Sequence, residues 1–142
     1  MKFEMTNDKI IVYIFDNKYF KENKEDIVKN VFEILTKYYT IELKKAYYLK
    51  LYINKYYGMI LEILEDKELS KDNIVNLNLR ILNDTLFLYE IEDPLNYINE
   101  EIYYYDDKYY LNIKKNDIKL IENTNMIYSD DVYKIIGKGI KI

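Results

Sequence analysis

Apolar and polar side chains alternate residue by residue in several short stretches of this sequence. The clearest case is residues 75–81, where valine, leucine and isoleucine alternate with asparagine and arginine. A period of two places the apolar residues on one face of a strand and the polar residues on the other. Further strands are expected at residues 8–15, 47–53, 59–63, 85–91, 102–105 and 108–113.

One segment has helical periodicity instead. Apolar residues three and four positions apart predict one main helix over residues 24–39. Its apolar stripe comprises Ile27, Val31, Ile34, Leu35 and Tyr38. Asn23 is a favourable N-cap, and the carboxylates of Glu25 and Asp26 suit the positive end of the helix dipole.

Asn and Asp, more than Pro or Gly, mark the turns between the expected strands. The chain has one proline and three glycines. We expect hairpin loops at residues 54–58, at Asn83-Asp84 and at Asp106-Asp107.

Two short helical segments are expected in the C-terminal half. Asp93-Pro94 predicts an N-cap and first helical residue for a turn that reaches Ile98. Residues 130–136 predict a short helix capped by Asp130 or Asp131 and closed by Gly137. A final extended piece would contain Ile140 and Ile142.

Together these segments predict the fold class. Strands joined by short loops pair antiparallel, so we expect an α+β fold with hairpin-rich antiparallel sheets, one main helix near the N-terminus and short helical turns later. The charged segment 65–73 is the best candidate boundary. It would separate a strand–helix–strand–strand subdomain at residues 1–65 from a strand-rich subdomain at 71–142, although 142 residues also fit one domain.

The side chains that most often carry catalysis are scarce. Histidine and cysteine are absent, which removes the commonest general base near neutral pH and the commonest metal ligands. Neither Ser70 nor Ser129 lies in a nucleophile elbow, and the three glycines cannot form a phosphate loop. We therefore expect no enzyme activity, no catalytic residue, no cofactor and no metal.

Paired carboxylates keep one catalytic class open. They occur at Glu100-Glu101, Asp106-Asp107 and Asp130-Asp131. A carboxylate-dependent enzyme would require two of them to converge in a pocket. The alternative is that these residues serve in turns and helix caps and face water.

Charge and hydropathy restrict the partners. The net charge is −4, and Arg80 is the only arginine beside twenty lysines, so a nucleic-acid partner is not expected. The run of apolar residues at 10–15 is far shorter than the ~20 residues of a membrane span. With no cysteine and no signal-peptide pattern at the N-terminus, we expect a cytoplasmic protein without a membrane partner.

Eighteen tyrosines are the best candidates for a recognition surface. Neighbouring tyrosines on a strand divide between its two faces, and one set would remain outside the core. The candidate partner-binding residues are Tyr48, Tyr52, Tyr104 and Tyr110. An exposed set would suit protein recognition, or single-stranded nucleic acid with lysines nearby. The alternative is that they form ordinary cross-strand pairs in a chain of biased composition.

The order of segments resembles the MecA family of adaptor proteins from low-GC Gram-positive bacteria. KFEMTNDKIIVYI (residues 2–14) looks like that family's opening strand. The expected helix at 24–39 and the strand pair AYYLKLYINKYYGMILEIL (46–64) lie where its N-terminal domain has a helix and two strands. LFLYEIEDPLNYI (86–98) and IYYYDDKYYLNI (102–113) resemble the strand, short helix and tyrosine-rich hairpin of its C-terminal domain. The chain is shorter than the family pattern, with a reduced acidic linker and a truncated helix after Ile91.

The resemblance implies a cofactor-free bacterial adaptor. Its N-terminal half would hold a client protein, and its C-terminal half would dock on a Clp-type ATPase. The residues themselves predict a non-enzymatic protein-binding protein, such as an adaptor or inhibitor. A hairpin-rich sheet also has edges to protect, and one of them could pair across a homodimer.

Overall fold

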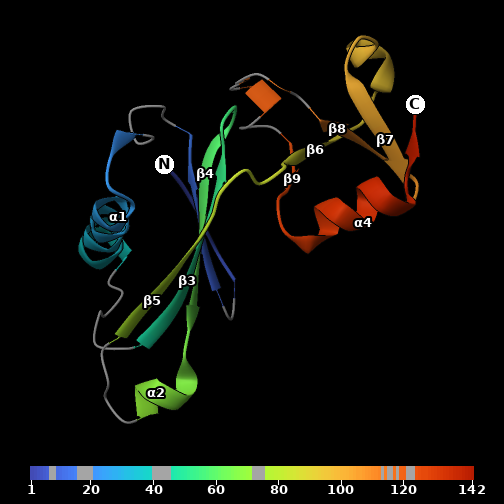
Figure 1. The fold of residues 1–142 in the computed structure, drawn as a ribbon. Coiled ribbons are helices and arrows are strands. Elements are labelled where there is room, and N and C mark those ends of the chain that lie inside the picture. The colour runs from blue at the N-terminus through green and yellow to red at the C-terminus, as the bar shows by residue number, and fades with distance from the viewer. Residues whose placement is uncertain are drawn as a thin grey trace. The chain divides into compact units, whose positions relative to one another are not determined.

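Two compact units make up the chain. The structure, a computed structural model, describes residues 1–6, 9–15, 21–39, 46–71, 76–112, 114, 117, 119–120 and 124–142. Unit 1 comprises Met1–Ile53 and Gly58–Asn83, and unit 2 comprises Asn54–Tyr57 and Asp84–Ile142. Each unit has its own five-stranded sheet and an α-helix, as Figure 1 shows. The predicted α+β class is confirmed.

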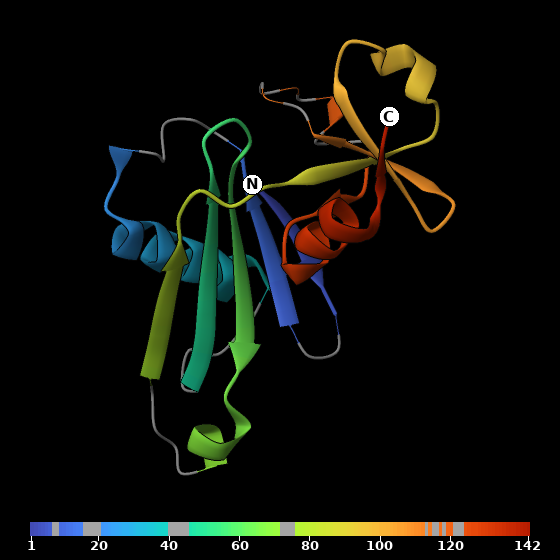
Figure 2. The same ribbon diagram turned by 45° about the vertical axis from the view of Figure 1, so that its right-hand side comes forward.

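Unit 1 is built around a sheet with one helix-covered face. Its elements are β1 (Lys2–Met5), β2 (Lys9–Ile14), α1 (Lys24–Tyr39), β3 (Ala46–Asn54), β4 (Gly58–Glu65), α2 (Lys67–Lys71) and β5 (Asn76–Leu82). The strand order is β1-β2-β4-β3-β5. Figure 2 shows α1 running behind this sheet, with β5 at its outer edge.

The start of α1 follows the expected capping pattern. The side-chain oxygen of Asn23 accepts a hydrogen bond from the backbone N–H of Glu25 at 2.8 Å. Glu25 and Asp26 occupy the first turn. The buried residues of the helix are Ile27, Val28, Val31, Phe32 and Leu35. Tyr38 was expected in this stripe, but it is 68% exposed.

The core of unit 1 lies between α1 and one face of the sheet. Alternate residues of β2, β3 and β4 point into it, because successive side chains of a strand face opposite ways. The contributing strand residues are Val12, Ile14, Tyr47, Leu49, Leu51, Met59, Leu61 and Ile63. The predicted strands at 47–53 and 59–63 therefore have the expected buried face.

β5 differs from its expected pairing. The signal at Asn83-Asp84 predicted a hairpin between this strand and the next one, but β5 pairs parallel with β3 in unit 1. β6 (Leu88–Ile91) belongs to the sheet of unit 2. Leu79 packs against the α1 core, whereas Leu88 packs in the core of unit 2, so burial in two separate cores outweighed the local turn signal.

The division between the units also differs from the proposed boundary. The segment 65–73 was expected to separate two halves, but the chain changes unit after Asn83. α2 lies within the earlier segment, and the parallel strand β5 then returns to the sheet of unit 1.

Unit 2 is an antiparallel sheet with a helix packed on it. Besides β6, its elements are η2 (Pro94–Tyr97), β7 (Glu101–Tyr105), β8 (Lys108–Asn112), β9 (Met126–Ile127), α4 (Asp130–Lys138) and β10 (Ile140–Lys141). The strand order is β10-β7-β8-β6-β9, and every pair is antiparallel. One cluster of buried residues in this unit consists of Leu88, Tyr103, Tyr110, Val132 and Ile135.

Two of the expected turns in unit 2 are confirmed. Asp106 and Asp107 join β7 to β8 with φ angles of 51° and 62°, the positive values that a two-residue type I′ hairpin requires. Asp93 caps η2, because its side chain accepts a hydrogen bond from Leu95 N at 3.0 Å.

The C-terminal helix is longer than expected. Gly137 was expected to close it, but Lys138 is the last residue of α4. Gly139 is the C-cap, and its N–H donates to the Ile135 carbonyl at 2.7 Å. Across the described part of the chain, no helix has the length and apolar content needed to cross a membrane.

Candidate functional site

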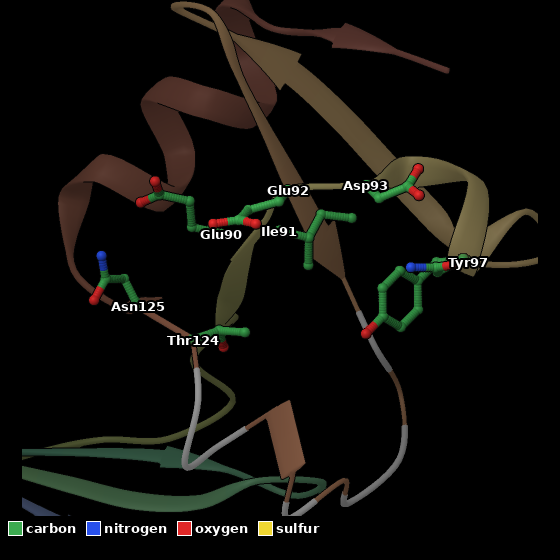
Figure 3. Close-up of a pocket in the computed structure, with 8 residues that line it drawn as sticks. Glu90, Ile91, Glu92, Asp93, Tyr97, Thr124 and Asn125 are labelled. Carbon is green, nitrogen blue, oxygen red and sulfur yellow. The ribbon is translucent and has the colours of Figure 1, made fainter.

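A pocket of about 460 Å³ opens beside β6 in unit 2. Its lining is mostly acidic and polar: Glu90, Ile91, Glu92, Asp93, Asn96, Tyr97, Thr124 and Asn125. In Figure 3, Glu90, Thr124 and Asn125 lie on one side of Ile91, and Asp93 and Tyr97 lie on the other. The pocket lining therefore contains three acidic residues, Glu90, Glu92 and Asp93, and one buried apolar residue, Ile91.

Local backbone structure positions these groups. β6 supplies Glu90 and Ile91, and the N–H of Glu90 donates to the carbonyl of Asn125 at 2.9 Å. This bond holds the segment that carries Thr124 and Asn125 alongside the strand. The hydroxyl of Thr124 donates to the Leu120 carbonyl at 2.6 Å, which fixes the other end of that segment.

The three carboxylates differ in their partners. Glu90 lies 3.3 Å from the ammonium of Lys108 on the neighbouring strand. One oxygen of Asp93 accepts the capping hydrogen bond from Leu95 N. Glu92 is exposed, and within the described residues it has no hydrogen-bond or ion-pair partner. The negative charge of the pocket is therefore only partly balanced.

Exposed apolar side chains border the same region. Leu95 is 74% exposed and Ile98 is 76% exposed. Leu95 lies in η2 between pocket-lining neighbours, and Ile98 follows that turn directly. Large apolar side chains exposed next to a polar concavity are typical of interaction sites.

The described part of the pocket shows no grouping of side chains suited to a metal ion. Within the described residues, no group of three or more acidic, histidine or cysteine side chains has the arrangement needed to hold a metal ion. Its carboxylates can instead attract an organic cation, such as a lysine ammonium or an arginine guanidinium.

The tyrosines chosen on β3 share a face but differ in exposure. Tyr48 is 47% exposed, whereas Tyr52 is buried at 8%. The hydroxyl of Tyr48 hydrogen-bonds to Asp66, which raises the pKa of Tyr48 above its usual value. Of this pair, only Tyr48 presents a substantial part of its ring to solvent.

The tyrosines chosen on β7 and β8 lie on opposite faces of the unit 2 sheet. Residues directly opposite in an antiparallel pair share a face, and Tyr103 lies opposite Tyr110 while Tyr104 lies opposite Tyr109. Tyr110 is buried in the core, so it does not share an exposed face with Tyr104. The residue of β8 that shares a face with Tyr104 is Tyr109.

Tyr104 is half-buried on the outer face of the hairpin. Its ring lies 5.1 Å from that of Tyr109, and its hydroxyl donates to Asp107 at 2.9 Å. That hydrogen bond raises the pKa of Tyr104. These contacts stabilise the hairpin, and a role for Tyr48 or Tyr104 in partner binding stays a prediction.

Sequence reasoning missed the acidic pocket, although a signal for it was present. No lysine or arginine occurs between Arg80 and Lys108, and this stretch contains eight acidic residues. The charge of the whole chain is mixed, so a survey along its full length obscured one acidic segment.

Comparisons with protein families, curated proteins and solved structures gave no match.

Proposed function

We propose that the protein acts by binding another protein, and that its unit 2 pocket receives a basic side chain of that partner. The observation that carries the proposal is the partly unbalanced acidic pocket bordered by the exposed side chains of Leu95 and Ile98. A basic residue flanked by apolar residues is the complementary partner segment. An adaptor or inhibitor acts through surfaces of this kind.

Electrostatics favour a cationic partner group. Glu90, Glu92 and Asp93 line the pocket, and Lys108 is the cation paired with Glu90. Opposite charges raise the association rate and restrict the choice of partner, while the buried apolar contacts supply much of the affinity.

The same carboxylates support binding better than catalysis. A two-carboxylate enzyme needs one group to donate and one to accept a proton or attack the substrate. Glu90 forms an ion pair with Lys108, and Asp93 accepts the hydrogen bond from Leu95 N that caps η2. Only Glu92 lacks a partner among the described residues, which leaves a single unengaged carboxylate.

An adaptor role in the manner of the MecA family belongs to the same proposal. A client protein would bind one unit, and a Clp-type ATPase of a bacterial cytoplasm would bind the other. The pocket of unit 2 is the surface that would meet the ATPase, because the resemblance assigns docking to the C-terminal half.

A charge-neutralising variant tests the pocket directly. Glu92→Gln with Asp93→Asn removes two charges, and asparagine keeps an oxygen that can cap η2. The probe is a fluorescent peptide of alternating lysine and leucine, followed by anisotropy. We expect the variant to bind roughly tenfold more weakly, because it loses two exposed ion pairs of at most about 1 kcal/mol each, and tenfold corresponds to about 1.4 kcal/mol.

The control removes two charges elsewhere in the same unit. Asp130→Asn with Asp131→Asn neutralises an exposed pair in the first turn of α4, and we expect it to bind like the parent protein. Equal weakening by both variants would show that net charge alone drives binding. Turnover of a substrate that Glu92→Gln abolishes would replace the binding role with a catalytic one.

One observation favours a second candidate function, binding of single-stranded nucleic acid. In the register of β3 and β5, Lys50 lies opposite Arg80, and both are exposed on the same face as Tyr48. Two cations next to an exposed ring suit a phosphate and a stacked base. A salt titration with a single-stranded oligonucleotide would test it, since genuine phosphate contacts weaken steeply as salt rises.

A further inference from the structure

The two edges of the unit 1 sheet are protected very differently. β1 is a four-residue edge strand that carries Lys2 and Glu4. β5 is a seven-residue edge strand in which Arg80 is the single charged residue. Short, charged edges resist further pairing, whereas long edges with few charges invite it. Within the part of the chain that the structure describes, no strand pairs with the outer side of β5.

Apolar side chains on β5 are left partly uncovered. Its register with β3 places Leu77, Leu79 and Ile81 on the face that α1 covers. Leu79 packs against the core, but Leu77 remains 43% exposed and Ile81 40% exposed. The same strand, β5, therefore has both an unpaired edge and exposed apolar side chains among the described residues.

A groove of about 190 Å³ runs between this strand and α1. Leu49, Leu77 and Leu79 line it from the sheet, and Glu25, Val28 and Lys29 line it from the helix. The lining is apolar at the sheet and carries one charge of each sign at the helix.

We propose that this edge binds a second copy of the chain, with the two β5 strands antiparallel across a two-fold axis at Leu79. In this register Leu77 of one copy lies opposite Ile81 of the other, so the exposed apolar residues cover one another. Asn78 lies opposite Arg80, and no two like charges are directly opposed. The two sheets of unit 1 then form one continuous sheet.

Charge complementarity on α1 supports a second copy over a different protein. In a two-fold interface every contact is reciprocal: where one residue contacts a second residue of the other copy, that second residue also contacts the first across the interface. Glu25 and Lys29 lie one helical turn apart at the groove, so a two-fold axis running past it brings Glu25 of each copy towards Lys29 of the other. A surface whose charges complement those of its own copy suits a homodimer.

Mass measurements across a dilution series test the dimer. We expect the intact protein to approach twice 17.4 kDa as its concentration rises. Leu77→Lys with Ile81→Lys adds charge at solvent-exposed positions of the edge, and we expect this variant to remain at 17.4 kDa. The control is Met5→Lys on β1, a 50% exposed residue of the opposite edge, which should dimerise like the parent protein.

Circular dichroism of each variant shows whether the fold is retained. A parent protein that remains monomeric at every concentration would overturn the proposal. So would a dimer that the Leu77→Lys and Ile81→Lys changes leave intact. Failure of the dimer leaves the unit 2 pocket unaffected, since its peptide assay measures a different surface.

Disulfide trapping tests the register, because the chain has no cysteine of its own. Residues directly opposite in an antiparallel pair have Cα atoms about 4.5–5.5 Å apart, within the range that a disulfide spans. A mixture of Asn78→Cys and Arg80→Cys proteins should therefore cross-link, and neither should do so alone. Cross-linking of either variant by itself would contradict pairing centred on Leu79.

Discussion

At the scale of single residues, the side chain of Glu101 contacts residues on three strands. Its carboxylate accepts hydrogen bonds from the Tyr103 hydroxyl at 2.8 Å and from the Asn112 amide at 2.9 Å. The ammonium of Lys141 lies 2.8 Å away. One acidic side chain thus connects β7, β8 and β10 at one end of the unit 2 sheet.

These contacts make the stability of the protein depend on pH. The hydrogen bond from Lys141, followed by that from Tyr103, lowers the pKa of Glu101, although partial burial opposes the shift. A lowered pKa gives stability that is present above the unfolded value of about 4.3 and is lost as pH falls through the folded value. Glu101→Gln should therefore reduce the free energy of unfolding at neutral pH.

The measurement is urea unfolding at several pH values between about 7 and 3. The difference in unfolding free energy between the parent protein and Glu101→Gln should shrink as the pH falls. A difference that stays constant over this range would contradict the assigned ionic role.

Two glycines provide opposite expectations for the same substitution. Gly58 has φ of +134°, and a Cβ there would overlap the backbone oxygen of Ile14. Gly58→Ala should destabilise the protein by on the order of 1–3 kcal/mol. Gly137 lies inside α4 with open space around it, so Gly137→Ala should stabilise by about 0.5–1 kcal/mol. Thermal unfolding of both variants checks the contrast in sign.

At the scale of elements, the N-terminus of α1 depends on one side chain. Asn23→Ala removes the oxygen that accepts the Glu25 N–H and should cost about 1 kcal/mol of stability. Asn23→Asp keeps the acceptor and adds a favourable charge at the positive end of the helix, so it should retain the stability of the parent. Urea unfolding followed by circular dichroism separates the two, and equal losses would indicate that the side chain does not act as a cap.

Local patterns predicted most individual elements. The bounds of α1, the cap at Asp93 and the turn at Asp106-Asp107 follow from side-chain periodicity and turn chemistry, which act over a few residues. The partner of β5 could not be read in this way. Parallel pairing with β3 depends on burial against α1, and that is a property of the assembled core.

The candidate site was less predictable than the fold. A period of two shows that neighbouring tyrosines divide between faces, but it does not show which set faces the core. Register decided this, since pairing of Tyr103 with Tyr110 buried both of them. The acidic pocket joins residues near positions 90 and 125, which only the folded chain brings together.

At the scale of the whole molecule, the loop of the β3–β4 hairpin belongs to a different unit from the strands that it joins. Its residues Asn54–Tyr57 belong to unit 2, although both flanking strands lie in the sheet of unit 1. Tyr57 is buried, and its ring lies 5.1 Å from Phe87 in an edge-on contact and 6.4 Å from Tyr89. Asn54 donates to the Thr85 carbonyl at 2.8 Å. The chain therefore enters unit 2 twice.

Loss of this ring should affect residues far away in the sequence. Tyr57→Ala should lower the free energy of unfolding by about 3–5 kcal/mol, as expected when a large buried aromatic side chain is removed. Amide hydrogen exchange in β6 should accelerate with it. The control is Tyr56→Ala in the same loop, where the ring is less buried and lies against Lys55. Equal exchange rates in the two variants would contradict a structural role for Tyr57.

This arrangement has a consequence for biosynthesis. Tyr57 leaves the ribosome thirty positions before Phe87, so its ring cannot pack against Phe87 until the later segment emerges. At usual elongation rates that interval is roughly 2–6 seconds. During that time the tip of the nascent hairpin exposes an aromatic ring that is buried in the folded protein. The rate of translation across these thirty codons therefore sets how long the ring is exposed to non-native contacts.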